Sequence, residues 1–139
     1  MTRRERVLSA FFSRLGTLVG ANVLRNEALP VRIPDGGLVI LRDGEVTAID
    51  ITLNPRSEYH SHRVVVEAIT IGDDAALDTL MVAIGDVLAE DETLGGLIET
   101  LTVLPPDVGV TPVENAATLR HATLPVVVEY LVSGALTEE

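Results

Sequence analysis

Apolar residues recur every three or four positions in two segments, and this spacing predicts two amphipathic helices. The first covers residues 3–19 and ends near Gly20, and its two phenylalanines are expected to pack it onto a sheet. The second begins at Asp73 or Asp74, because a short carboxylate caps the free amides of a first helical turn. The expected core stripe of this second helix comprises Leu77, Leu80, Met81, Ile84, Val87 and Leu88.

Alternation of apolar and polar residues predicts a β-hairpin over residues 38–53. Asp43 and Gly44 interrupt the alternation, and an Asp-Gly pair tolerates the positive φ angles that tight hairpin turns require. In the second strand of this hairpin Ile49, Ile51 and Leu53 fall on one face. We therefore expect that face to be buried and the opposite face to be wet.

Further extended segments flank these elements. A piece bracketed by prolines is expected at a sheet edge, since proline cannot donate to a ladder. The remaining strands are predicted at residues 29–34, from Tyr59 towards Gly72, at 98–104 and at 124–132, with 107–119 irregular. The sequence thus predicts a single α+β domain over residues 1–139. Two main helices pack on a small, mostly antiparallel or mixed sheet, in the order α-β-β-β-β-α-β-β.

Charge is distributed unevenly along the 139 residues. Residues 1–63 carry nine Arg and seven acidic residues, a net +2, whereas residues 64–139 carry one Arg and fourteen acidic residues, a net −13, which together give −11. So acidic a chain is not expected to bind nucleic acid sequence-specifically, because that binding relies on basic side chains at phosphates. Its apolar runs are too short for a membrane helix, and the absence of Cys excludes thiolate chemistry.

The uneven charge suggests that an Arg-bearing surface of one copy meets an acidic surface of another in a head-to-tail contact. The alternative is a solvated acidic face that maintains solubility. Like charges four residues apart on the second helix cost about 0.2–0.5 kcal/mol per pair, which an Arg, a divalent cation such as Mg²⁺ or water can relieve. The candidate interface residues are Arg3, Arg4, Arg56, Arg63, Asp74, Asp78, Asp86 and Glu90.

Two groups of side chains are candidates for metal binding. His60 and His62 lie two apart in an extended segment and so share a face, with His121 or Glu58 as a possible third ligand. Carboxylates at the start of the second helix offer oxygen ligands or an acid/base pair. These are Asp73, Asp74 and Asp78. The structural alternatives are two solvated histidines at the exposed start of a strand and ordinary helix capping. The sequence predicts no catalytic residue and no cofactor.

The element order resembles that of the tail terminator proteins of long-tailed bacteriophages, of the minor tail protein U type. The resemblance is carried by HRVVVEAITIGDDAALDTLMVAIGDVLAEDETLGGL and by the late strand PVVVEYLV. It implies a structural protein that forms a homohexameric ring on the head-proximal end of the tail tube, stops tube growth and provides the surface for head attachment. The implied partners are further copies of the chain, the tail tube protein and a head-completion protein. The implied locations are the virion tail and, during assembly, the host cytoplasm.

Three alternatives remain open from the sequence. Another head-tail connector or neck component would bind the portal side rather than the tube. A metal-dependent enzyme would use His60 and His62 with nearby carboxylates, and a small ligand-binding module would need a pocket. For a ring, acidic side chains facing the lumen would repel DNA phosphates as the DNA passes.

Overall fold

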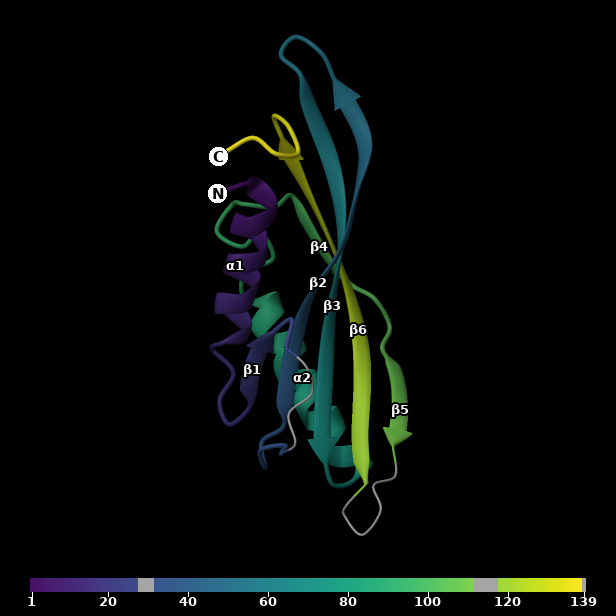
Figure 1. Cartoon of the computed structure of the whole chain (residues 1–139). Coiled ribbons are helices and arrows are strands. Elements are labelled where there is room, and N and C mark those ends of the chain that lie inside the picture. The colour runs from purple at the N-terminus through teal and green to yellow at the C-terminus, as the bar shows by residue number, and fades with distance from the viewer. Residues whose placement is uncertain (28–31, 112–117, 139) are drawn as a thin grey trace.

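The computed structural model describes residues 1–27, 32–111 and 118–138, and in it two helices pack on one face of a six-stranded mixed sheet (Figure 1). The predicted α+β class, with two main helices on one sheet, is confirmed. Three strands precede the second helix and three follow it. The elements are α1 (Arg3–Leu15), β1 (Asn22–Arg25), β2 (Leu38–Thr52), β3 (Ser57–Ile71), α2 (Asp74–Ala89), β4 (Thr100–Val103), β5 (Asp107–Thr111) and β6 (Leu119–Val132).

The sheet has the strand order β1-β2-β3-β6-β4, and β5 pairs with β6 on the same side as β4. β1 runs parallel to β2, and the other pairs are antiparallel. Between β4 and β5 the chain passes through Leu104, Pro105 and Pro106, where the prolines lack the N–H groups that a continuous ladder needs. One edge of β6 is therefore covered by two short strands instead of one long strand.

Helix α1 forms as its apolar spacing predicts. The side chain of Thr2 caps its first turn by accepting a hydrogen bond from the backbone N–H of Glu5 at 3.2 Å. Its buried residues recur at helical spacing and include Phe11, which is fully buried as expected, while Phe12 is only partly buried. The helix ends at Leu15 and is capped by Gly16, earlier than predicted.

Helix α2 is capped by Asp73, whose side chain accepts a hydrogen bond from the backbone N–H of Ala76 at 3.0 Å. The expected stripe faces the sheet. Two of its members, Met81 and Val87, are only partly buried. The fully buried members are Leu77, Leu80, Ile84 and Leu88.

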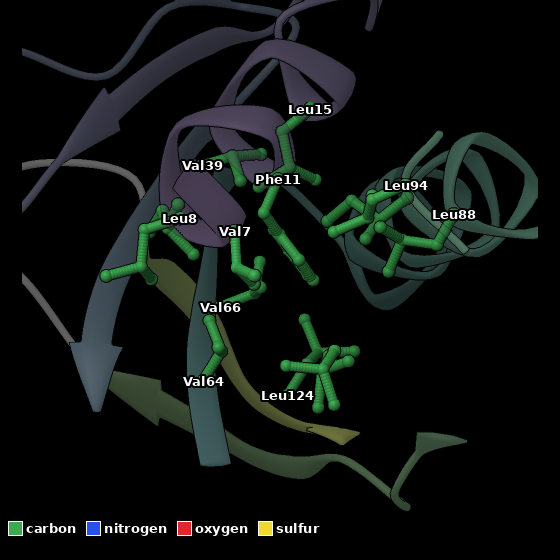
Figure 2. Close-up of a cluster of buried hydrophobic side chains, with 14 of the residues drawn as sticks. Val7, Leu8, Phe11, Leu15, Val39, Val64, Val66, Leu88, Leu94 and Leu124 are labelled. Carbon is green, nitrogen blue, oxygen red and sulfur yellow. The ribbon is translucent and has the colours of Figure 1, made fainter. Parts of the chain in front are cut away.

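The main core lies between the two helices and the sheet. Figure 2 shows Phe11 and Leu15 of α1 facing strand side chains and Leu88 of α2. A smaller buried cluster lies on the opposite face of the sheet and consists of Ile33, Leu38, Ile40 and Ile69. Among the described residues, the strand positions of this second cluster lie where β2 pairs with β1 and with the end of β3, in the lower part of the sheet in Figure 1.

The predicted hairpin turn at Asp43-Gly44 is wrong. β2 continues through these residues, and its pairing register with β3 shifts between Arg42 and Glu45, which marks a β-bulge. Gly44 does adopt a positive φ of 69°, so the Asp-Gly signal reports a real backbone requirement. That requirement belongs to a bulge within one strand.

The true turn joins β2 to β3 at residues 53–56, and the two strands project beyond the helices (Figure 1). We call residues 46–57 the hairpin arm. The prediction of a buried face here is wrong, since Ile49, Ile51 and Leu53 are 53%, 49% and 72% exposed. No other element of the described chain extends far enough to cover them (Figure 1).

Two further predictions need correction. The first edge strand is β1 at Asn22–Arg25, and the segment predicted in its place, residues 29–34, lies partly outside the described residues. The segment expected to be irregular, 107–119, contains β5 and the start of β6, although 112–117 lie outside the described residues.

No helix of the described chain is long and apolar enough to cross a membrane.

Candidate functional site

His62 is a buried structural residue, which contradicts its interpretation as solvated. Its Nε2 lies 2.6 Å from the backbone oxygen of Asp43, which can only accept, so Nε2 carries the proton. Its Nδ1 lies 3.0 Å from the hydroxyl of Tyr130. Burial lowers the pKa of His62, and burial raises the pKa of Tyr130 to about 12. The neutral imidazole therefore accepts a hydrogen bond from the tyrosine hydroxyl, and neither ring nitrogen is left for a metal.

His60 is also buried, and its Nε2 lies 3.1 Å from a carboxylate oxygen of Glu58. The predicted third ligand, His121, lies on the other face of the sheet, because it pairs in register with Ile69, nine residues along β3. The acidic group at Asp73 lies beyond the far end of β3, about 35 Å from His60 at 3.3 Å per strand residue. Among the described residues no three His, Cys, Asp or Glu side chains gather in a way that could hold a metal ion.

The acidic residues of α2 divide into two kinds. Asp74 accepts a hydrogen bond from Arg120 at 2.6 Å, and Glu90 lies 3.3 Å from Arg14. The repulsion expected along this helix is thus relieved at its two ends by arginines of the same chain. Asp78 and Asp86, in contrast, are exposed, and within the described residues no cation lies at ion-pair distance from either of them.

The arginine candidates divide in the same way. Arg4 lies 3.5 Å from Asp43 at the base of the arm, so it is engaged within its own chain. Arg56 is 59% exposed on the arm, and its one ion pair among the described residues is a long 3.7 Å contact with Glu58. Arg63 is exposed on the sheet face away from the helices. Arg3 lies half-buried near the start of α1.

A network of charged side chains fastens α1 to the sheet below the arm. Arg25 donates to Glu5 at 2.7 and 2.9 Å and to Asp43 at 3.1 Å. The hydrogen bond from Arg25 lowers the pKa of Glu5. Burial alone would raise the pKa of Asp43, but hydrogen bonds from Arg25 and Asn26 hold it below its usual value. Sequence spacing gave no signal for this network, because its members lie on three separate elements.

Two of the exposed surfaces combine apolar and charged side chains. The first is the hairpin arm, with Ile49, Ile51, Leu53 and Arg56. The second is the face of α2 directed away from the sheet, which we call the outward stripe. It consists of Asp78, Val82, Gly85, Asp86 and Ala89, all exposed and spaced to lie on one side of a helix. Both surfaces combine exposed apolar side chains with charged ones.

Comparison with known proteins finds chains of similar structure. The chain is similar in structure to a chain of a virion described as that of a native gene transfer agent particle. The TM-score is 0.54 at 18% sequence identity, and the match covers 93% of this chain and 90% of the other. At this identity the likeness shows a shared fold over nearly the whole length of both chains. No family model matches the sequence, and no curated protein matches it.

Proposed function

We propose that this protein is a structural component of a phage-like particle that caps the tail tube as a ring, ends tube polymerisation and provides the surface to which the head attaches. The observation that carries the proposal is the fold shared with a virion chain over 93% of this chain. Because fold alone does not determine function, the role also needs support from the surfaces of this molecule. The sequence resemblance to tail terminators supports this particular role within the particle.

The two exposed surfaces support an assembly role. An arm with three large exposed apolar side chains is costly for a protein that remains alone, since such patches promote association. The arm and the outward stripe lie on different parts of the molecule (Figure 1). Contacts between unlike surfaces are heterologous, and such contacts form a closed ring when the rotation between copies closes.

A head-tail connector or neck component is a second candidate. The similar chain is described only by the particle that contains it, so the same observation is compatible with another position in the head-tail junction. The two candidates differ in their partner, because a terminator binds the end of the tail tube whereas a neck component binds the portal side.

The first test is the molar mass in solution, measured by light scattering after size-exclusion chromatography. We expect a ring of about 89 kDa, which corresponds to six copies of 14.8 kDa. Six copies with a net charge of −11 each repel one another, so assembly is expected to strengthen as NaCl screens that repulsion. MgCl₂ at matched ionic strength distinguishes general screening from a specific effect of the cation. A monomer under every condition would contradict the ring.

The second test mixes the protein with purified tail tubes and with portal-containing heads in separate samples. Electron microscopy is expected to show density at one end of each tube, and tube-protein polymerisation is expected to stop when the protein is added. Binding to portal vertices with no effect on tubes would favour the neck component instead.

A further inference from the structure

The hairpin arm exposes large apolar side chains, and no part of the chain that the structure describes covers them. Single exposed apolar residues are ordinary, but here Ile49, Ile51 and Leu53 gather on one projecting hairpin. β1 pairs only with Leu38–Leu41, so the outer edge of β2 along the arm has no partner strand among the described residues. Proteins usually protect such edges, which can otherwise pair with other chains. The arm therefore has the features of a surface that pairs with another chain.

Arginine side chains lie beside the turn of this arm. A shallow hollow there is lined by Pro55 and Arg56 of the turn, by Arg6 of α1 and by Leu131 of β6. Among the described residues the one ion pair of Arg56 is its long contact with Glu58, and exposed ion pairs of this kind contribute little, so its guanidinium can exchange partners at small cost. The surface that fits the arm should thus combine apolar contact area with carboxylates.

The outward stripe of α2 has this combination. Val82 is 55% exposed and lies between Asp78 and Asp86, four residues from each. Gly85 stands mid-helix, where glycine costs about 0.5–1 kcal/mol relative to alanine, yet a Cβ there would meet no atom within 4 Å. Packing within this chain therefore does not require glycine at this position. A bare backbone next to Val82 does give an incoming side chain room to approach closely.

We propose that the hairpin arm of one copy docks on the outward stripe of α2 in a second copy. Ile51 and Leu53 would contact Val82 and the bare surface at Gly85, and Arg56 would face the carboxylates of the stripe. The arm points away from α2 of its own chain (Figure 1), so the contact forms between copies. The inference rests on the proposed ring and deepens it by naming the two surfaces that join neighbouring copies.

Two blocked variants test this contact. The arm variant carries Ile51→Asp and Leu53→Asp, and the stripe variant carries Val82→Asp and Asp78→Arg. All four positions are exposed, so both variants should keep the wild-type circular dichroism spectrum and melting temperature. Each is expected to raise the dissociation constant of the assembly at least about tenfold and to run as a monomer. The matched control is Val110→Asp on β5, which is 53% exposed and should assemble like wild type.

Mixing the two blocked variants provides the decisive measurement. The stripe variant retains an intact arm, and the arm variant retains an intact stripe. Together they should form a one-to-one dimer that grows no further, because each remaining surface is blocked. A charge reversal gives a milder check, in which Arg56→Glu weakens assembly and combination with Asp78→Arg and Asp86→Arg restores it.

Other outcomes would overturn the inference. Rings that persist in both blocked variants would show that other surfaces join the copies, while the proposed tail role would stand. An arm variant that still forms rings but no longer binds tail tubes would identify the tube as the occupant of the arm. A wild-type protein that stays monomeric under all ionic conditions would remove both the ring and the contact.

Discussion

Both ends of β2 carry large apolar residues, but these residues are buried at one end and exposed at the other. Leu38–Leu41 are fully buried between the helices on one face and the Ile33 cluster on the other. Further along the strand, Ile49 and Ile51 are about half exposed because no layer reaches them. Alternation in a sequence therefore reports that a face is suited to burial. Whether it is buried depends on what lies above it, within the chain or in an assembly.

Asp43 marks the boundary between the helix-covered part and the arm. The bulge at this residue directs its carboxylate towards Arg25 and its backbone oxygen towards His62. One residue thus connects the charged network that holds α1 to the buried histidine beneath the arm. Below this point Leu38–Leu41 of β2 are fully buried, and above it β2 becomes exposed while His60 and His62 of β3 stay buried on the face that carries the main core.

The largest expected effect on stability comes from weakening the packing of α1 on the sheet. Phe11→Ala deletes a fully buried ring that packs α1 against the sheet (Figure 2). We expect it to lower the free energy of unfolding by about 3–5 kcal/mol, because the change removes transfer energy and leaves a cavity. Urea denaturation followed by circular dichroism measures this difference. Phe12→Ala, at a partly buried neighbouring position, is the control and should cost clearly less.

A loss below 1 kcal/mol for Phe11→Ala would contradict the contrast between the helix-covered part of the sheet and the hairpin arm. It would mean that the helix-covered part is no better packed than the arm.

The second effect concerns the hydrogen bond under the arm. Tyr130→Phe removes the hydroxyl that donates to His62 and leaves the imidazole Nδ1 buried without a partner. We expect a loss of about 1–3 kcal/mol, the usual cost of an unsatisfied buried polar atom. The same urea titration measures it. Tyr59→Phe, on the opposite face of the same sheet, is the control and should change stability less.

If Tyr130→Phe were neutral, water would have to reach His62. The boundary between packed and exposed strand would then lie lower than residue 62.

The third effect is a dependence on pH. Burial holds the pKa of folded His62 below its ordinary 6.5, so the unfolded chain binds more protons than the folded chain as pH falls below about 6.5. Stability should therefore decrease as pH falls from 7 towards 5. Glu5 and Asp43 have lowered pKa values in the folded state, so their contribution is lost only at lower pH, as it falls through those values. Urea midpoints at pH 7, 6 and 5 measure the first window.

His62→Gln provides the matched variant, because the amide keeps a donor for the Asp43 oxygen without titrating. Its stability should change less than that of wild type between pH 7 and 5. Equal slopes for the two proteins would assign the pH dependence to other groups.

The sequence predicts some elements well for a physical reason. Helices α1 and α2 repeat their apolar residues at the helical period, and their caps, such as Asp73, are local. The hairpin turn predicted at Asp43-Gly44 was wrong because a tight turn and a β-bulge both require a positive φ. Only the pairing with the partner strand distinguishes the two. β5 escaped prediction because a short edge strand containing Gly109 has little pattern of its own.

The histidine pair shows the same limit at the level of the site. The two-residue spacing of His60 and His62 correctly indicates a shared face, but not which face. That depends on Tyr130, which lies 68 residues away from His62 in sequence. The division of the acidic residues into paired and exposed ones likewise depends on distant arginines, such as Arg120 for Asp74. Nonlocal pairing, which no single-sequence pattern encodes, determined each of these outcomes.

The smallest expected effect is in the arm itself. Leu53→Ala removes a side chain that is 72% exposed, so little apolar area returns to water on unfolding, and the free energy of unfolding should stay within about 0.5 kcal/mol of wild type. Leu41→Ala is the matched control in the same strand, fully buried, with an expected loss of about 2–5 kcal/mol. Both are measured by urea denaturation at low salt and at a concentration where light scattering reports monomers. A loss above 1 kcal/mol for Leu53→Ala would mean that the arm folds against its own chain. The apolar face would then no longer be available to a second copy.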